Sequence, residues 1–290
     1  MIQYEPKSFL RILFGFRGSV FLAVLPRVTV AAAIAWLAHR GNVRIPPTVH
    51  SLLGVALGLL LVFRTNASYD RYWEGRKLLG QINNRARDLM RQSAAYIEGD
   101  DADAKGARAE IRRLVVLFYS LVRQHLRAER DLSKLRADAT PEERAALEPA
   151  STRPALALAW LSRHLGDNVR AGRIRDAAFQ KMDDNLTSFV DAYGGCERIL
   201  RTPIPFAYAQ HIKAFLSLFC FTVPFALVDS LHQYTPVAAA VIAYGLFGIE
   251  EIGVEIEDPF GTDPNDLPLD AIGERIAEDA KSVLADRDRA

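Results

Sequence analysis

Apolar and charged residues are strongly segregated along this chain. Four stretches are nearly free of charge, at residues 18–37, 45–63, 204–228 and 230–249. A helix needs about 20 mostly apolar residues to cross a hydrocarbon layer about 30 Å thick. The sequence therefore predicts a membrane protein with four spanning helices.

The predicted spans differ in whether charged residues or prolines interrupt them. The second, 45–63, contains no Asp, Glu, Lys or Arg. The first carries Arg27, which should face protein or water because a charge is costly in lipid. Lys213 interrupts the third, and Pro224 should kink it. Membranes tolerate such breaks where neighbouring helices or a water-filled cavity provide hydrogen-bond partners for the freed backbone groups. The spans should therefore form a bundle that lines an internal space.

Between the second and third spans lies a long polar region without strand signals. Apolar periodicity predicts helices at about 66–97, 107–126 and 176–200. Residues 98–106 and 127–153 should be loops or a weak surface helix. We predict an all-α fold, a four-span bundle with a large cytosolic helical domain. Its parts are an N-terminal segment (1–17), spans 1 and 2 (18–63), the helical domain (64–203), spans 3 and 4 (204–249) and a C-terminal tail (250–290) that ends in an amphipathic stretch at 271–284.

Lys and Arg residues flank the spans unevenly, which predicts orientation. They precede the first span, follow the second and precede the third, whereas the loop at 229–235 has none. Arg40 and Arg44 in the first loop oppose this pattern but are outnumbered. Both termini and the helical domain should therefore lie in the cytoplasm.

Composition excludes several classes of function. The 36 basic and 35 acidic residues leave a net charge of +1, so nucleic acid is not an expected partner. Cys196 and Cys220 lack the spacing of a thiolate metal site and should be small buried hydrophobes. The six histidines show no paired spacing. We do not expect an enzyme.

The second span presents two neighbouring helical features. Gly54 and Gly58 form a small-xxx-small pair, which lets another backbone approach closely. Val55, Leu59 and Phe63 are four residues apart and stack into an apolar column on another face. In a ring of subunits this column would form hydrophobic rings that gate by dewetting. The alternative is that the column is bundle core or faces lipid.

Three motifs follow one another among the spans. They read FRTNASYDRYWEGR at 63–76, PIPFAY at 203–208 and EDPFGTDPND at 257–266. Their composition and order resemble the bestrophin family, whose bacterial branch has comparable runs after the second span, before the third and after the fourth. The resemblance extends over nearly the whole chain apart from variable loops.

The resemblance implies a homopentamer in the lipid of the cell inner membrane, with one central pore that passes monovalent ions. The neck would be lined by Val55, Leu59 and Phe63, and the cytosolic constriction by Ile204. Through its bacterial branch, the resemblance favours a cation such as sodium over chloride. A neck of neutral side chains carries no fixed charge to select either sign.

The acidic third motif has two interpretations. In animal bestrophins the corresponding loop binds calcium, and Asp263 and Asp266 fall at its carboxylate positions, with Glu255 and Asp258 where backbone carbonyls would lie. Calcium prefers such oxygen ligands. The alternative is a proline-rich turn capped by Asp side chains. No other cofactor is expected.

Two other functions stay open at this point. A secondary transporter is suggested by the broken third span and by Lys213 and Asp229 near membrane depth, although the two halves show no internal repeat. A membrane-embedded, metal-dependent enzyme would use the carboxylates around the end of the fourth span. These are Glu250, Glu251, Glu255, Asp258, Asp263 and Asp266.

Overall fold

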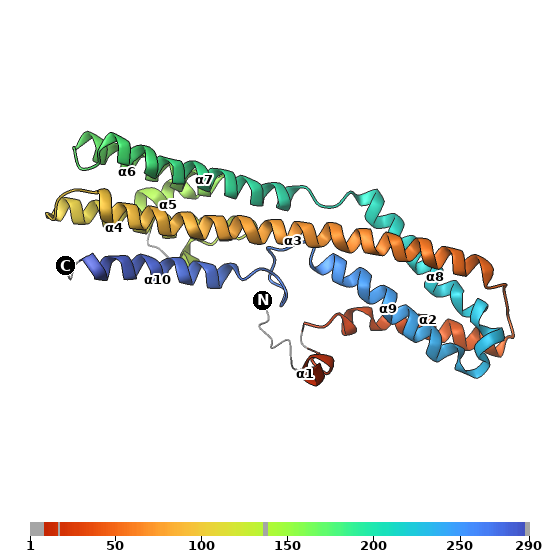
Figure 1. Cartoon of the computed structure of the whole chain (residues 1–290). Coiled ribbons are helices and arrows are strands. Elements are labelled where there is room, and N and C mark those ends of the chain that lie inside the picture. Colours follow the sequence, from red (N-terminus) through yellow and green to blue (C-terminus); the bar gives the residue numbers. More distant parts are fainter. Residues whose placement is uncertain (1–8, 17, 136–138, 288–290) are drawn as a thin grey trace. The chain divides into compact units, whose positions relative to one another are not determined.

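The computed structural model describes residues 9–16, 18–135 and 139–287, and all regular structure in these ranges is helical. The chain divides into two compact units. Unit 1 comprises residues 1–73 and 202–266, and unit 2 comprises residues 74–201 and 267–290. The all-α prediction is therefore confirmed for the described residues (Figure 1).

Unit 1 contains the apolar helices. These are α1 (Phe9–Leu13), α2 (Phe21–Arg40), the first part of α3 (Thr48–Tyr96), α8 (Phe206–Leu231), the 3₁₀ turn η2 (His232–Tyr234) and α9 (Thr235–Glu255). Figure 1 shows α8 and α9 joined through η2 as a hairpin. By length and composition, three described stretches could cross a membrane: α2, α3 and the run Phe206–Glu255 that joins α8 to α9.

The core of unit 1 is built from one side of each long helix. Leu57 and Leu61 of α3 pack with Leu216 and Phe219 of α8 and with Phe247 of α9. Pro224 lies inside α8 and is buried, so neighbouring helices cover the point where the helix lacks a backbone donor. The side chains that fill the core are apolar on all of these helices, as the charge-free stretches predict.

The helix of the second span continues beyond the predicted break at residues 64 and 65. We predict a helix at 45–63 and a separate one at 66–97, but α3 is a single helix of 49 residues, Thr48–Tyr96. The reason is that its buried stripe continues through the change in polarity: Leu57 and Leu61 are followed at helical spacing by the buried polar residues Arg64 and Ser68. No proline or glycine interrupts residues 64–74.

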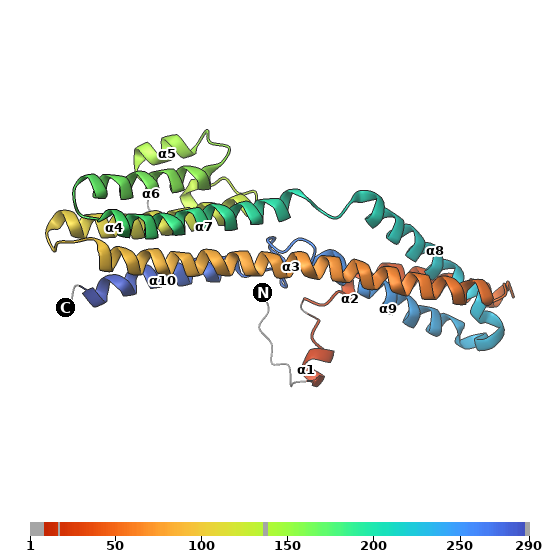
Figure 2. The same cartoon turned by 45° about the horizontal axis from the view of Figure 1, so that its top comes forward.

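Unit 2 packs the rest of α3 with the polar helices. These are α4 (Ala102–Leu126), the 3₁₀ turn η1 (Leu132–Lys134), α5 (Pro141–Leu147), α6 (Arg153–Arg170), α7 (Asp176–Arg201) and α10 (Leu269–Arg287). Figure 2 shows α6 lying beside α4 and α7. The rings of Phe118 and Phe189 meet in this core with centroids 4.9 Å apart.

One helix of unit 2, α6, has no counterpart among the helices predicted from the sequence. Between α4 and α6, the described residues are irregular apart from η1 and α5, but α6 itself is not predicted. Leu158, Leu161 and Leu165 form its buried stripe, and Pro154 occupies its first turn, where a missing backbone donor costs little. The prediction for the two cysteines is confirmed, since both are free and buried. Burial raises the pKa of the Cys196 thiol to about 12.

Candidate functional site

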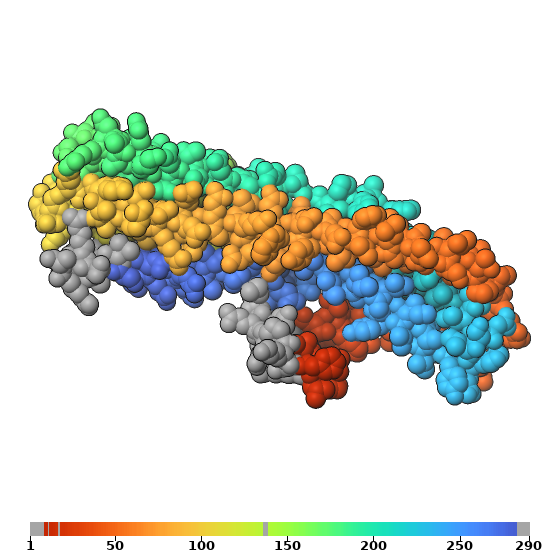
Figure 3. All heavy atoms as spheres, in the orientation of Figure 1, coloured from red at the N-terminus to blue at the C-terminus, as the bar shows by residue number. Residues whose placement is uncertain are grey.

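The apolar column on α3 lies on the surface of unit 1. Val55, Leu59 and Phe63 are 76%, 57% and 55% exposed, whereas Leu57 and Leu61 on the same helix are buried in the core. Figure 3 shows the orange spheres of α3 uncovered on the viewed face. The column is therefore not part of its own subunit's core, and its side chains face outward.

The two glycines of the second span have different surroundings. A side-chain carbon added at Gly54 would lie 3.4 Å from the Phe219 ring, so Gly54 allows α3 to pack against that side chain of α8. A carbon added at Gly58 would meet no described atom within 4 Å. Only Gly54 is therefore used for packing within the subunit, and its neighbour is a ring rather than a backbone.

A buried ion pair connects α3 with the segment after α9. Arg64 is only 2% exposed, and its Nη2 donates to Glu257 Oε2 at 2.5 Å, while its Nη1 donates to Ser68 Oγ at 2.8 Å. The other oxygen of the same carboxylate, Glu257 Oε1, accepts from the backbone N–H of Ile204 at 2.9 Å. Glu257 thus joins α3 to the residue predicted to line the cytosolic constriction.

A second arginine strengthens this connection. Arg71 Nε donates to the backbone carbonyl of Glu257 at 3.1 Å, and its Nη1 donates to the carbonyl of Thr202 at 2.5 Å. We call Arg64, Arg71 and Glu257, with the backbone of Thr202 and Ile204, the Glu257 anchor. It brings together residues from all three sequence motifs.

The anchor was missed in the sequence analysis as an interacting group, although each side chain lies in a quoted motif. The signal was the glutamate that opens the third motif, together with two arginines seven residues apart, at helical spacing, in the first. Motif order cannot show that these residues meet.

The acidic turn after α9 is stabilised by its own backbone. Asp266 is buried, and its Oδ2 accepts from the backbone N–H of Asp263 at 2.6 Å. A side-chain carbon at Gly261 would lie 2.6 Å from that oxygen, so a larger residue there would push the Asp266 carboxylate away from this position. The pKa of Asp266 is raised to about 6: burial is the largest cause, the hydrogen bond from the Asp263 backbone opposes it, and the nearby charges of Asp263, Asp258 and Glu255 add to the increase.

These contacts bear on the predicted calcium ligands. Asp263 is exposed while Asp266 points into the turn, and no three His, Cys, Asp or Glu side chains of the described residues group as a metal site. The Glu255 carboxylate accepts a hydrogen bond from Asn265 Nδ2 at 2.9 Å, which leaves the predicted role of the Glu255 backbone carbonyl untested. Side chains alone do not form a calcium cage here, so a bound ion would depend on backbone carbonyls.

Charged residues within the apolar helices form a cluster of their own. Arg27 of α2 donates to Glu251 Oε2 at 2.8 Å and lies 3.7 Å from buried Glu250, which also lies 3.6 Å from Lys213 of α8. The expectation that Arg27 faces protein is confirmed. Asp229 pairs with Arg44 at 2.5 Å. Glu250 and Glu251, considered for an enzyme, and Lys213 and Asp229, considered for a transporter, thus each lie within ion-pair distance of an opposite charge on another segment of unit 1.

Comparison with known proteins agrees with the resemblance. Residues 1–282 match the family model described as bacterial/fungal bestrophin protein. The chain is 39% identical over 271 residues to a voltage-dependent anion channel-forming protein of Nostoc sp., covering 92% of this chain and 88% of that protein. It is 35% identical over 288 residues to the protein of the same description in Synechocystis sp., covering 97% and 93%.

A solved structure gives the same result. The crystal structure of a bacterial bestrophin homologue from Klebsiella pneumoniae superposes with a TM-score of 0.83 at 30% identity, and the match covers 92% of this chain and 99% of that one. The motifs, the helical fold and these similarities over nearly the full length lead to one conclusion. The chain belongs to the bestrophin family, in its bacterial and fungal branch.

Proposed function

We propose that this chain is one subunit of a homopentameric channel that conducts monovalent ions passively through a central pore. The observation that carries the proposal is the outward position of Val55, Leu59 and Phe63 on a helix whose opposite side is core. A continuous apolar column on the surface of a membrane helix must face lipid, another subunit or a pore. In a closed ring of identical subunits, one such column per subunit surrounds the axis.

The neck would act through hydrophobicity rather than charge. Rings of Val, Leu and Phe side chains exclude water when narrow, so ions pass only when the rings widen or rehydrate. At the cytosolic end, Ile204 would form the second constriction, and the Glu257 anchor supports this assignment because it fixes the Ile204 backbone. Both termini would lie in the cytoplasm and the spans in the inner membrane, as the Lys and Arg distribution indicates.

The conducted ion is assigned from the relatives. Those of Nostoc and Synechocystis are named as anion channel-forming proteins. We therefore propose an anion such as chloride, in place of the sequence-based preference for a cation, which has no support in these names. The channel-forming relatives also confirm that the chain is not an enzyme, so the metal-dependent alternative is set aside.

A flux experiment with matched variants tests the neck. Purified protein in liposomes should pass ions down their gradient without saturation or coupling, and Leu59→Ala should raise the conductance severalfold. Leu218→Ala is the control, because Leu218 is a 59% exposed leucine on α8 and Leu59 is 57% exposed on α3. Equal flux through both variants would remove Leu59 from the pore, and saturable, coupled flux would favour a transporter.

A separate measurement decides the sign of the ion. In asymmetric potassium chloride, an anion-selective channel has a reversal potential near that of chloride, and a cation-selective channel one near that of potassium. A reversal potential near that of potassium would overturn the anion assignment while leaving the pore intact.

Calcium at Asp263 and Asp266 stays a prediction. If calcium binds there, adding calcium should raise the melting temperature of the wild-type protein, and Asp263→Asn should remove this effect. Asp263 is the residue to replace because it is exposed, whereas Asp266 holds the turn through its hydrogen bond to the Asp263 backbone.

A further inference from the structure

Unit 2 contains a polar pocket of about 420 Å³. It is formed by the end of α4, the loop that follows, the turn before α6 and the end of α7. This volume is in the range of sites that bind small metabolites. The polar lining residues are Gln124, Glu129, Arg130, Ser151, Arg153 and Arg201, with His125 beside them.

Arg153 places an uncompensated charge at this pocket. Its side chain is buried, and its three guanidinium nitrogens donate to the backbone carbonyls of Leu147 at 2.8 Å, Arg130 at 2.9 Å and Glu148 at 3.4 Å. No carboxylate of the described residues forms an ion pair with it. These carbonyls engage only three of the five guanidinium N–H donors and do not neutralise the charge, which is unfavourable in a buried position.

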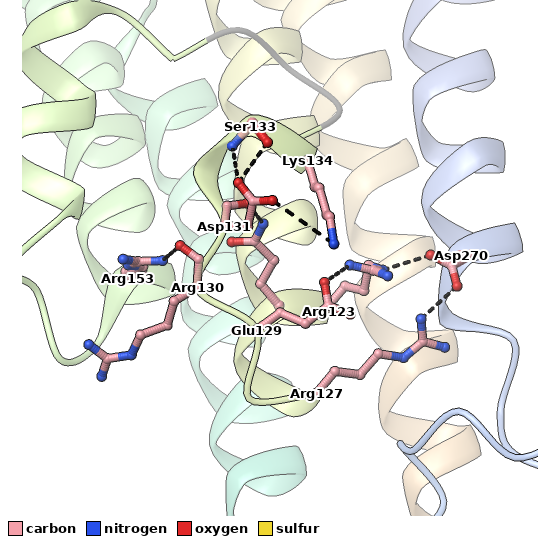
Figure 4. A network of polar contacts seen from close by, with 10 residues as sticks. Arg123, Arg127, Glu129, Arg130, Asp131, Ser133, Lys134, Arg153 and Asp270 are labelled. Carbon is pink, nitrogen blue, oxygen red and sulfur yellow. Dashed lines mark hydrogen bonds and ion pairs between the residues drawn. The ribbon is translucent and has the colours of Figure 1, made fainter.

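Arg130 adds a second cation to the same pocket. Figure 4 shows its guanidinium with no dashed line to any residue drawn, and within the described chain it has no hydrogen-bond or ion-pair partner. The remaining charges are already paired: Glu129 lies 2.7 Å from Arg123, and Arg201 lies 3.1 Å from Glu197. The pocket therefore has an excess of positive charge from Arg130 and Arg153.

Gln124 contributes a hydrogen-bond acceptor without a donor. The residue is buried, and its Nε2 donates to the carbonyl of Asp131 at 2.6 Å, which fixes the amide. Its Oε1 is buried and accepts from no group of the described residues. A buried acceptor without a partner is unfavourable, so a donor is missing from the pocket.

We propose that this pocket binds a small organic anion that carries a carboxylate or phosphate group together with a hydroxyl or ammonium donor. The anionic group would bind the planar donor arrays of Arg130 and Arg153, which suit two-oxygen acceptors. The donor would bind Gln124 Oε1. Such a ligand supplies both missing partners, and because it contacts segments adjoining α4, α6 and α7 it would stabilise unit 2.

Calorimetric titration of the full-length protein in detergent tests this site without any measurement of conduction. The probes are glycerol 3-phosphate and L-glutamate, which represent the phosphate and the carboxylate classes. Inorganic phosphate has the anion but no organic donor, and glycerol has the donors but no charge. We expect one of the two probes to bind and to raise the melting temperature. If neither binds at millimolar concentration, or if inorganic phosphate binds as tightly as the better probe, the proposal is overturned.

Two arginine variants locate the binding. Arg130→Ala should weaken binding of the better probe roughly 10-fold to 100-fold, because one charge-assisted contact is lost. Arg163→Ala is the matched control, since Arg163 is an exposed arginine of α6 outside the pocket lining, and it should bind as the wild type does. Arg130 is exposed and its side chain supports no other contact, so this variant should fold normally. Unchanged affinity in Arg130→Ala would place the ligand elsewhere and refute the site.

Discussion

Each unit contains an arginine–carboxylate cluster, and the two differ in their access to solvent. In the Glu257 anchor of unit 1, Arg64 is 2% exposed and shares one partly buried carboxylate with the Ile204 backbone. In unit 2, Arg123 and Arg127 both bond to Asp270 at 2.6 Å, and the Asp270 side chain is 48% exposed (Figure 4). We call these three residues the Asp270 cluster.

The difference in burial decides how much each cluster contributes to the stability of the protein. Breaking a buried pair leaves a charge without a partner in a poorly solvated place, whereas water and salt replace a lost partner at the surface. The distances are similar, so geometry alone does not rank the clusters. Burial predicts that the Glu257 anchor is the more important for stability and for the position of Ile204.

The largest expected effect comes from Arg64→Ala. It leaves the Glu257 carboxylate without its buried partner and should lower the free energy of unfolding by about 3–5 kcal/mol. Thermal unfolding in detergent measures this loss. Arg64→Ala combined with Glu257→Gln should lose less than Arg64→Ala alone, because no charge is stranded. A wild-type melting temperature in Arg64→Ala would contradict the ranking of the clusters.

An intermediate effect is expected from Arg71→Ala. The variant removes two hydrogen bonds from a charged donor to the carbonyls of Glu257 and Thr202. The loss should be about 2 kcal/mol, as for hydrogen bonds to charged groups. Hydrogen exchange should also speed up at the Ile204 amide, whose acceptor would be less firmly held. Unaltered exchange at Ile204 would mean that Arg64 alone positions Glu257.

A smaller effect is expected from Asp270→Asn. Burial acts to raise the pKa of Asp270, but hydrogen bonds from Arg127 and Arg123 outweigh it, and the net pKa is lowered from 3.8. A lowered pKa in the folded state means that the cluster stabilises the protein above pH 3.8 and loses this contribution as the pH falls through the folded value. The variant should cost about 1 kcal/mol at pH 7, given the exposure of Asp270. Melting curves at pH 7 and at successively lower pH values below 3.8 should show the difference from wild type shrink as the pH falls.

The smallest expected difference between the two clusters is in how their contributions to stability respond to salt. Raising the ionic strength from about 0.1 M to 1 M shortens the screening length from about 10 Å to 3 Å and weakens exposed pairs most. The cost of Asp270→Asn should therefore shrink at 1 M salt, while that of Arg64→Ala should change little. Equal shrinkage would show that water reaches both clusters.

The structural features that were predicted correctly are those that depend on the local pattern of apolar and polar residues. The apolar stretches became α2, α3, α8 and α9, and the column of Val55, Leu59 and Phe63 lies on one exposed face because four-residue spacing fixes that face whatever the rest of the fold. The predicted break between helices at 45–63 and 66–97 was wrong, since polarity changes at Arg64 while helix propensity and burial do not.

Other features depended on pairing between distant parts of the chain. Nothing local indicates that Glu257 bonds to both Arg64 and the Ile204 backbone, which lie far from it in sequence. Helix α6 was missed because its apolar stripe is short and follows a polar loop. The pocket beside Arg153 was not predictable either, because it depends on where three separated segments pack.

The way the anchor holds residue 204 has a consequence for engineering. Glu257 accepts from the backbone N–H of Ile204, and Arg71 donates to the backbone carbonyl of Thr202, so neither bond depends on which side chain position 204 carries. Leucine, valine or alanine could replace isoleucine there with the same backbone support. At the cytosolic constriction proposed for Ile204, side-chain volume and shape could then be varied across this series while the backbone bonds stay the same.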